Sequence, residues 1–145
     1  MADFLREMSR PSLSLPLLRR CVFAGFPSPA DNYVETGIDL NEELIHHPSS
    51  TFFLRVRGES MRDAGILDGD LLIVDRSLSP QAGDIVVAIV DGSFIVKRLI
   101  YRKNIFYLEA EHPNYPAINL NHHENVHFWG VATFSVHKLG RIKQG

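Results

Sequence analysis

The sequence has little that would favour export or membrane insertion. It contains a single cysteine, Cys21, among 145 residues, which excludes an internal disulfide framework and suits a reducing compartment. The apolar cluster at residues 13–18 is interrupted by Ser14 and Pro16 and is followed by two arginines, which is not the pattern of a signal peptide. No window approaches the apolar length of a membrane-spanning helix. We therefore expect a cytoplasmic protein without membrane association.

The sequence also lacks a large excess of positive or negative charge. The 15 Lys and Arg residues nearly balance 17 Asp and Glu residues, and the formal net charge is -2. A protein that binds DNA directly usually carries a basic face, so we expect no direct sequence-specific DNA binding. With 45% hydrophobic and 22% charged residues, the composition is that of one globular domain with a tail.

Patterns that bind metal ions are missing as well. The seven histidines include the adjacent pairs His46-His47 and His122-His123, and no His-Glu-x-x-His arrangement occurs. An acidic run does not have the spacing of a calcium loop, and its members are expected to be turn residues: Asp63, Asp68, Asp70 and Asp75. The sequence therefore predicts no metal site and no cofactor.

The composition changes near residue 50, and the two sides predict different structures. Before it, proline, serine and short apolar clusters alternate without a period, so residues 1 to about 30 are expected to form an extended arm with a helical turn near residues 3–8. Asp39-Leu40-Asn41-Glu42 resembles a capping box and predicts a short helix from about 40 to 47, ended by Pro48.

After residue 50 the pattern is that of β-strands separated by turns. Six segments are rich in β-branched, aliphatic and aromatic residues: 52–56, 70–75, 84–90, 94–99, 105–110 and 126–136. Asp91-Gly92 between two apolar runs is a strong hairpin signal. We therefore predict a mainly β fold, with a compact, curved and mostly antiparallel β domain.

The stretch CVFAGFPSP, at residues 21–29, cannot be helical. Pro27 and Pro29 fix their own φ angles and push the preceding residues out of the α region, so the segment runs extended. It holds the small pair Ala24-Gly25. A proline-rich linker and a strand presented to a protease or a sheet edge both fit this pattern.

Lys97 is a candidate base. Strand alternation places Ile95, Lys97 and Leu99 on one face. If that face is buried, desolvation lowers the pKa of Lys97, and a neutral lysine can accept a proton. The alternatives are that Lys97 reaches water at a strand end, or that Arg98 is the inward residue.

Ser60 is the group that such a base could activate. It follows a predicted strand and a turn at Gly58, which brings it to the end of the sheet. Alone, a serine in a turn is usually a hydrogen-bonding turn residue, and Arg62 stands where the hydrolase elbow requires glycine. Together with Lys97 it forms a candidate Ser-Lys pair. Cys21 has no histidine close in sequence and is not favoured as a nucleophile.

Three segments together resemble the self-cleaving LexA-type serine peptidases: GESM at 58–61, GILDGDLLIVD at 65–75, and GDIVVA at 83–88 with FIVKR at 94–98. The resemblance spans about residues 22–136 and implies a fold of the LexA and signal-peptidase type. It also implies that Ser60 is the nucleophile, Lys97 the general base, and Ala24-Gly25 the scissile bond.

Within that family, GFPSPA at 25–30 and IDLN at 38–41 resemble the UmuD branch. The branch implies three parts: an arm at 1–24 that self-cleavage removes, a linker with a short helix at 25–50, and a peptidase domain at 51–145. It implies stimulation by a RecA-DNA filament, a homodimer, and assembly with the catalytic subunit of a translesion DNA polymerase in the SOS response. Two alternatives stay open: a non-catalytic partner-binding module, and a signal-peptidase-like protease, which needs a membrane anchor.

Overall fold

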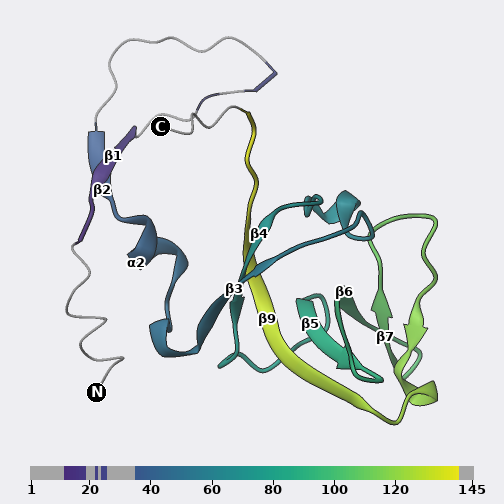
Figure 1. Cartoon of the computed structure of the whole chain (residues 1–145). Coiled ribbons are helices and arrows are strands. Elements are labelled where there is room, and N and C mark those ends of the chain that lie inside the picture. Colours follow the sequence, from purple (N-terminus) through teal and green to yellow (C-terminus); the bar gives the residue numbers. More distant parts are fainter. Residues whose placement is uncertain (1–11, 19–21, 23, 26–34, 141–145) are drawn as a thin grey trace. The chain divides into compact units, whose positions relative to one another are not determined.

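The computed structural model describes residues 12–18, 22, 24–25 and 35–140. The chain divides into two compact units, Met1–Ser49 and Ser50–Gly145, whose elements are labelled in Figure 1. The division falls where the composition changes.

The N-terminal unit contains a small strand pair that the sequence did not predict. Strand β1 (Leu15–Leu18) pairs antiparallel with β2 (Glu35–Ile38). Pro16 hid this strand from sequence reasoning, because proline cannot donate to a sheet ladder. A two-stranded sheet leaves one side of each strand free, and proline is tolerated there. The predicted helical turn at residues 3–8 and the prolines Pro27 and Pro29 lie outside the described residues.

Helix α2 (Leu40–Leu44) follows β2 and is shorter than predicted. Its N-cap is Asp39, whose side chain accepts a hydrogen bond from the Asn41 N–H over 2.9 Å, as the capping motif indicates. The helix ends at Leu44 because Ile45 already has an extended backbone. The prediction of the helix start is confirmed, and the predicted end at about residue 47 is wrong.

The second unit is built on one antiparallel sheet of seven strands in the order β3-β4-β9-β5-β6-β7-β8. The strands are β3 (Thr51–Arg55), β4 (Leu71–Asp75), β5 (Ile85–Val90), β6 (Ser93–Arg102), β7 (Ile105–Glu109), β8 (Ile118–Asn119) and β9 (Val126–Val136). Three short 3-10 turns accompany them: η1 (Pro48–Ser50), η2 (Arg62–Ala64) and η3 (Leu120–His122). The predicted mainly β, antiparallel fold is confirmed.

The predicted hairpin joins β5 to β6. Asp91 and Gly92 have φ angles of 49° and 85°, as a two-residue turn between twisted strands requires. Strand β6 continues to Arg102, beyond the predicted end at residue 99. The sequence analysis missed a second turn with positive φ, at Lys103 and Asn104, which lets β6 and β7 pair as far as Arg102 and Ile105.

Strand β9 is the long strand between β4 and β5, and its pairing shifts twice. Trp129 is an extra residue in the ladder with β5, and Thr133 is an extra residue in the ladder with β4. Such β-bulges bend a strand and increase its twist. Between them lies Gly130, where a Cβ atom would stand 2.6 Å from Cγ1 of Val74, so only glycine fits without displacement.

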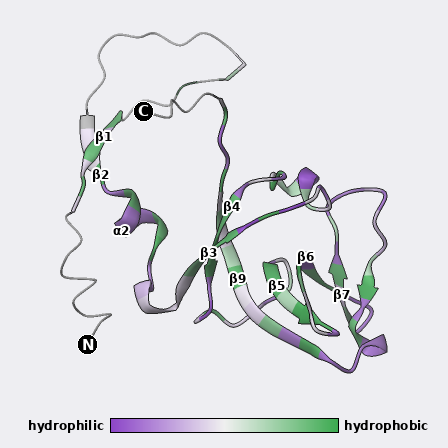
Figure 2. Ribbon diagram, viewed as in Figure 1, coloured by the Kyte–Doolittle hydropathy of each residue, from purple (hydrophilic) through white to green (hydrophobic). Residues whose placement is uncertain are grey.

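Hydrophobic side chains form two core clusters that share β5. The first contains Met61, Ile66, Leu72, Val74 and Val87. The second contains Val86, Ala88, Val90, Leu99 and Leu108. Successive residues of β5 therefore pack into different clusters, which follows from the two-residue period of a strand, and Figure 2 shows β5 as a largely hydrophobic ribbon. This strand links the two halves of the core.

Candidate active site

The loop that carries Ser60 is shaped by its neighbours. Gly58 has a φ angle of +94°, which turns the chain sharply after β3 and favours glycine. Its N–H donates to the Asp68 carboxylate over 2.7 Å. Met61, directly after Ser60, is 2% exposed and packs in the first core cluster. The loop is thus anchored on both sides of Ser60, whose own side chain is only partly buried.

Lys97 comes from the middle of β6, where it pairs with Val86 of β5. Its neighbours on the same strand face, Ile95 and Leu99, pack in the second core cluster. Lys97 is partly buried, and burial lowers the pKa of its ammonium below the usual value for lysine, because an apolar setting disfavours the charged form. The condition left open by the sequence, burial of the face that carries Ile95 and Leu99, is therefore met.

The fold brings these two side chains into direct contact. The Nζ atom of Lys97 lies 2.8 Å from Oγ of Ser60, across 37 positions of sequence. A protonated lysine donates this hydrogen bond, whereas a neutral lysine at the same distance can accept the hydroxyl proton. The ring of Tyr115 lies 5.7 Å from Nζ. A serine beside a lysine of lowered pKa can act as an activated nucleophile.

The predicted scissile residues belong to the other unit. Ala24 and Gly25 are exposed and lie in a bend of the N-terminal unit. A Cβ at Gly25 would meet no atom within 4 Å, so packing does not explain its glycine. Cys21, the other nucleophile considered from the sequence, lies outside the described residues.

Within residues 12–18, 22, 24–25 and 35–140, no three His, Cys, Asp or Glu side chains are grouped as a metal ion would need. The same part of the chain holds no helix long and apolar enough to cross a membrane.

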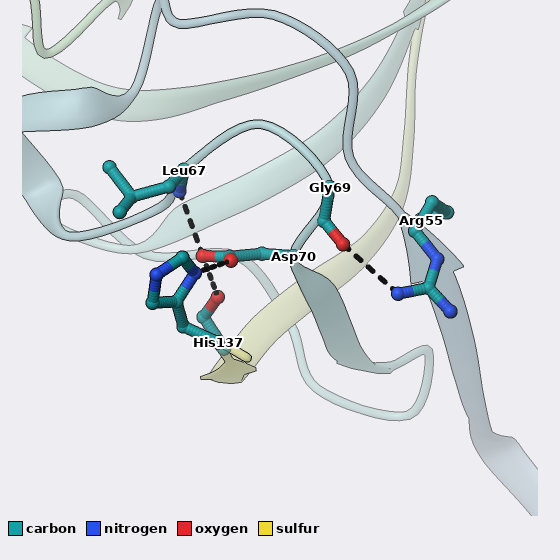
Figure 3. Close-up of polar contacts among 6 residues, drawn as sticks. Arg55, Leu67, Gly69, Asp70 and His137 are labelled. Atoms are coloured by element: carbon teal, nitrogen blue, oxygen red, sulfur yellow. Dashed lines mark hydrogen bonds and ion pairs between the residues drawn. The ribbon is translucent and has the colours of Figure 1, made fainter. Parts of the chain in front are cut away.

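The sequence analysis did not predict that the acidic residue just before β4 is buried. Asp70 is 1% exposed, although it was expected in a turn. Its carboxylate accepts hydrogen bonds from Leu67 N–H over 2.8 Å, from Ser135 Oγ over 3.0 Å and from His137 Nδ1. Figure 3 shows this arrangement, with Gly69 just before it bonded to Arg55. We call these four residues, Leu67, Asp70, Ser135 and His137, the Asp70 cluster.

The hydrogen bonds keep Asp70 charged. Burial alone would raise the pKa of Asp70, but the bonds from Leu67, His137 and Ser135 outweigh burial and hold that pKa below its usual value. One sequence signal was available: Asp70 directly precedes a run of four apolar residues in a strand, and an aspartate in that place needs partners if it is buried.

Comparisons with known proteins show the family to which the chain belongs. Residues 16–133 match the family described as Peptidase S24-like. The chain is 45% identical to Protein ImpA of Salmonella typhimurium over 130 residues, which cover 88% of this chain and 87% of that protein. It is 44% identical to Protein MucA of Escherichia coli over 125 residues, or 85% of this chain and 84% of MucA. It is 43% identical to Protein SamA of Salmonella typhimurium over 123 residues, or 85% of each chain. These three are UmuD-like SOS mutagenesis proteins.

Proposed function

The chain belongs to the family of S24-like peptidases and is a UmuD-like SOS mutagenesis protein, and from this premise we propose that it is a serine peptidase that cleaves its own chain between Ala24 and Gly25. The observation that carries the proposal is the 2.8 Å contact between Lys97 Nζ and Ser60 Oγ. The small side chains of Ala24 and Gly25 support it, because a bulky residue would keep the carbonyl carbon from coming within about 3–3.5 Å of the nucleophile.

The reaction follows the roles of a Ser-Lys pair. Neutral Lys97 takes the proton of the Ser60 hydroxyl, and Oγ attacks the carbonyl carbon of Ala24. The C–N bond breaks, Lys97 returns the proton to the nitrogen of Gly25, and Ala24 remains as an ester on Ser60. Water, deprotonated by Lys97, hydrolyses the ester and releases residues 1–24.

Donors for the developing oxyanion are available in the Ser60 loop. Among the described residues, the N–H groups of Glu59, Ser60 and Met61 donate no backbone hydrogen bond, whereas the next one, Arg62 N–H, donates to Glu59 over 3.1 Å. Free N–H groups beside a nucleophile can stabilise the negative oxygen. We assign this role to the segment 59–61.

The biological setting of the proposal comes from the UmuD-like relationship. We propose that a RecA-DNA filament stimulates the cleavage, and that the shortened chain acts as a homodimer with the catalytic subunit of a translesion polymerase. Removal of residues 1–24 would take β1 away from its partner β2, and proteolytic removal of a segment is a known way to switch a protein. Cleavage within one chain and between two chains are both compatible with this proposal.

The direct test is to follow the mass of the purified chain over time from neutral to alkaline pH. Cleavage at Ala24-Gly25 should accelerate with pH until Lys97 is fully neutral, because the neutral form is the base. Ser60→Ala and Lys97→Ala should each abolish it. Ser79→Ala, at an exposed position away from the Ser60 loop, is the matched control that should still cleave. A wild-type chain that stays intact even with RecA filaments would refute self-cleavage and favour the partner-binding module.

A further inference from the structure

Glu111, in the connection between β7 and β8, bonds to the Ser60 loop. Its backbone carbonyl accepts a hydrogen bond from the N–H of Asp63 over 2.8 Å. Asp63 lies three residues after Ser60, in the short turn η2. This bond fixes the far end of the Ser60 loop to a segment that is distant in sequence.

The side chain of the same residue bonds to the strand of Lys97. The Glu111 carboxylate accepts a hydrogen bond from Nε of Arg98, the residue after Lys97. Both side chains are largely withdrawn from solvent, at 29% and 32% exposure, so their ion pair is less screened than an exposed pair. Arg98 Nη1 also donates to the carbonyl of Gly83 over 2.6 Å, which secures the guanidinium from a second side.

The connection that carries Glu111 also reaches Lys97 directly. Tyr115, four residues further on, places its ring 5.7 Å from Lys97 Nζ and packs edge-on against His112. One short segment therefore contacts the loop of the nucleophile, the strand of the base, and the base itself. Among the residues that the structure describes, no other one bonds to both Asp63 and Arg98.

We propose that Glu111 is a positioning residue that sets the distance between Ser60 and Lys97 by joining the Ser60 loop to β6 through Asp63 and Arg98. The inference rests on the proposed function. Without the carboxylate, the backbone of residue 111 loses its attachment to β6, and the loop it holds can move away from the lysine. A shift of about 1 Å between reacting groups can slow a reaction by about 100-fold.

The test compares two ion pairs made by arginines of β6, Arg98 and Arg102. Glu111→Ala removes the pair with Arg98. Glu109→Ala removes the pair between Arg102 Nη2 and Glu109 Oε1, which are 3.3 Å apart. Within the described part of the chain, Glu109 forms no bond to the Ser60 loop. We expect self-cleavage of the full chain to slow by about 10- to 100-fold in Glu111→Ala and to change less than about twofold in Glu109→Ala. Glu111→Gln keeps an acceptor for Arg98, so its rate of self-cleavage should lie between those of the wild type and Glu111→Ala.

A second readout separates positioning from general destabilisation. If the loop moves away, water reaches Lys97 and its pKa rises, so the pH-rate profile of Glu111→Ala should shift to higher pH while that of Glu109→Ala does not. Rate loss together with this shift supports the proposal. An unshifted profile, an unchanged rate, or an equal loss in both variants overturns it.

Failure of the proposed function would look different. In a Ser60→Ala background no cleavage can occur, and the titration of Lys97 can still be followed by NMR of labelled lysine. A wild type that never cleaves refutes the peptidase. If Glu111→Ala raises the pKa of Lys97 in that background and Glu109→Ala does not, the result supports the positioning role of Glu111. If neither variant changes the pKa of Lys97, that role is refuted.

Discussion

Replacing Asp70 by asparagine should destabilise the second unit by an amount that depends on pH. Asparagine has nearly the same shape but only one acceptor oxygen. At least one of the three donors around Asp70, from Leu67, Ser135 and His137, must then face an NH₂ group. A hydrogen bond to a buried charge contributes about 1.5–3 kcal/mol. With some weakening of the remaining bonds, we expect a loss of about 2–4 kcal/mol in the free energy of unfolding at neutral pH.

The sign of the pH dependence follows from the pKa of Asp70. Because this pKa is lower in the folded chain than the usual 3.8, the ionised cluster stabilises the fold fully above the usual value. That contribution disappears as pH falls through the lower, folded value. The difference in free energy of unfolding between wild type and Asp70→Asn should therefore stay constant from about pH 7 to pH 5 and become smaller below about pH 4.

Urea unfolding followed by tryptophan fluorescence is the suitable assay. The sequence contains one tryptophan, and Trp129 lies in β9 of the second unit, so the signal reports on that unit alone. Asp63→Asn, whose side chain is 51% exposed, is the control and should change stability by less than about 0.5 kcal/mol. The reasoning would be refuted if wild type and Asp70→Asn were equally stable near neutral pH. It would also be refuted if the difference in their free energies of unfolding did not decrease below about pH 4.

Two further predictions concern packing and can be measured in the same way. Gly130→Ala should lower the free energy of unfolding by about 1–3 kcal/mol, because the new Cβ would lie 2.6 Å from Cγ1 of Val74, a residue with no exposed surface. Gly140→Ala is the control and should leave stability unchanged, because its new Cβ would meet no atom within 4 Å. Met61→Ala and Leu108→Ala should each cost about 2–5 kcal/mol of stability, but only Met61→Ala should also slow self-cleavage in folded protein, since Met61 anchors the loop of Ser60. Equal rates in the two variants would contradict that anchoring.

The sheet was predictable because its signals are local. Five of the six predicted strands match to within a residue at each end, and the Asp91-Gly92 hairpin has the predicted positive φ angles. The β1–β2 pair was not predictable, because Pro16 interrupts a four-residue strand whose partner lies about twenty positions away. Short strands that pair over such a distance leave no periodic pattern.

The contact between Ser60 and Lys97 was predictable from the sequence, whereas the residues that hold the two in place were not. Ser60 and Lys97 were chosen from chemistry and family resemblance, and the structure brings them together. Nothing in the sequence near Glu111 indicated that it bonds to both Asp63 and Arg98, since those contacts depend on how loops from separate hairpins meet. For the same reason, Asp70 was taken for a turn residue when it is the buried acceptor for His137.

The bulge at Thr133 has a consequence for the length of β9. Ser135 and His137 share one face of the chain beyond the bulge, and both bond to Asp70. The extra residue at the bulge is the one without a partner in β4, and residues 134–136 keep their partners whether or not it is present. Deleting it would therefore close the ladder without changing the face of Ser135 or His137. Inserting a residue after Phe134 would instead shift the register by one and turn both side chains away from the Asp70 carboxylate. Changes in chain length should therefore be tolerated at the bulge and not between the bulge and His137.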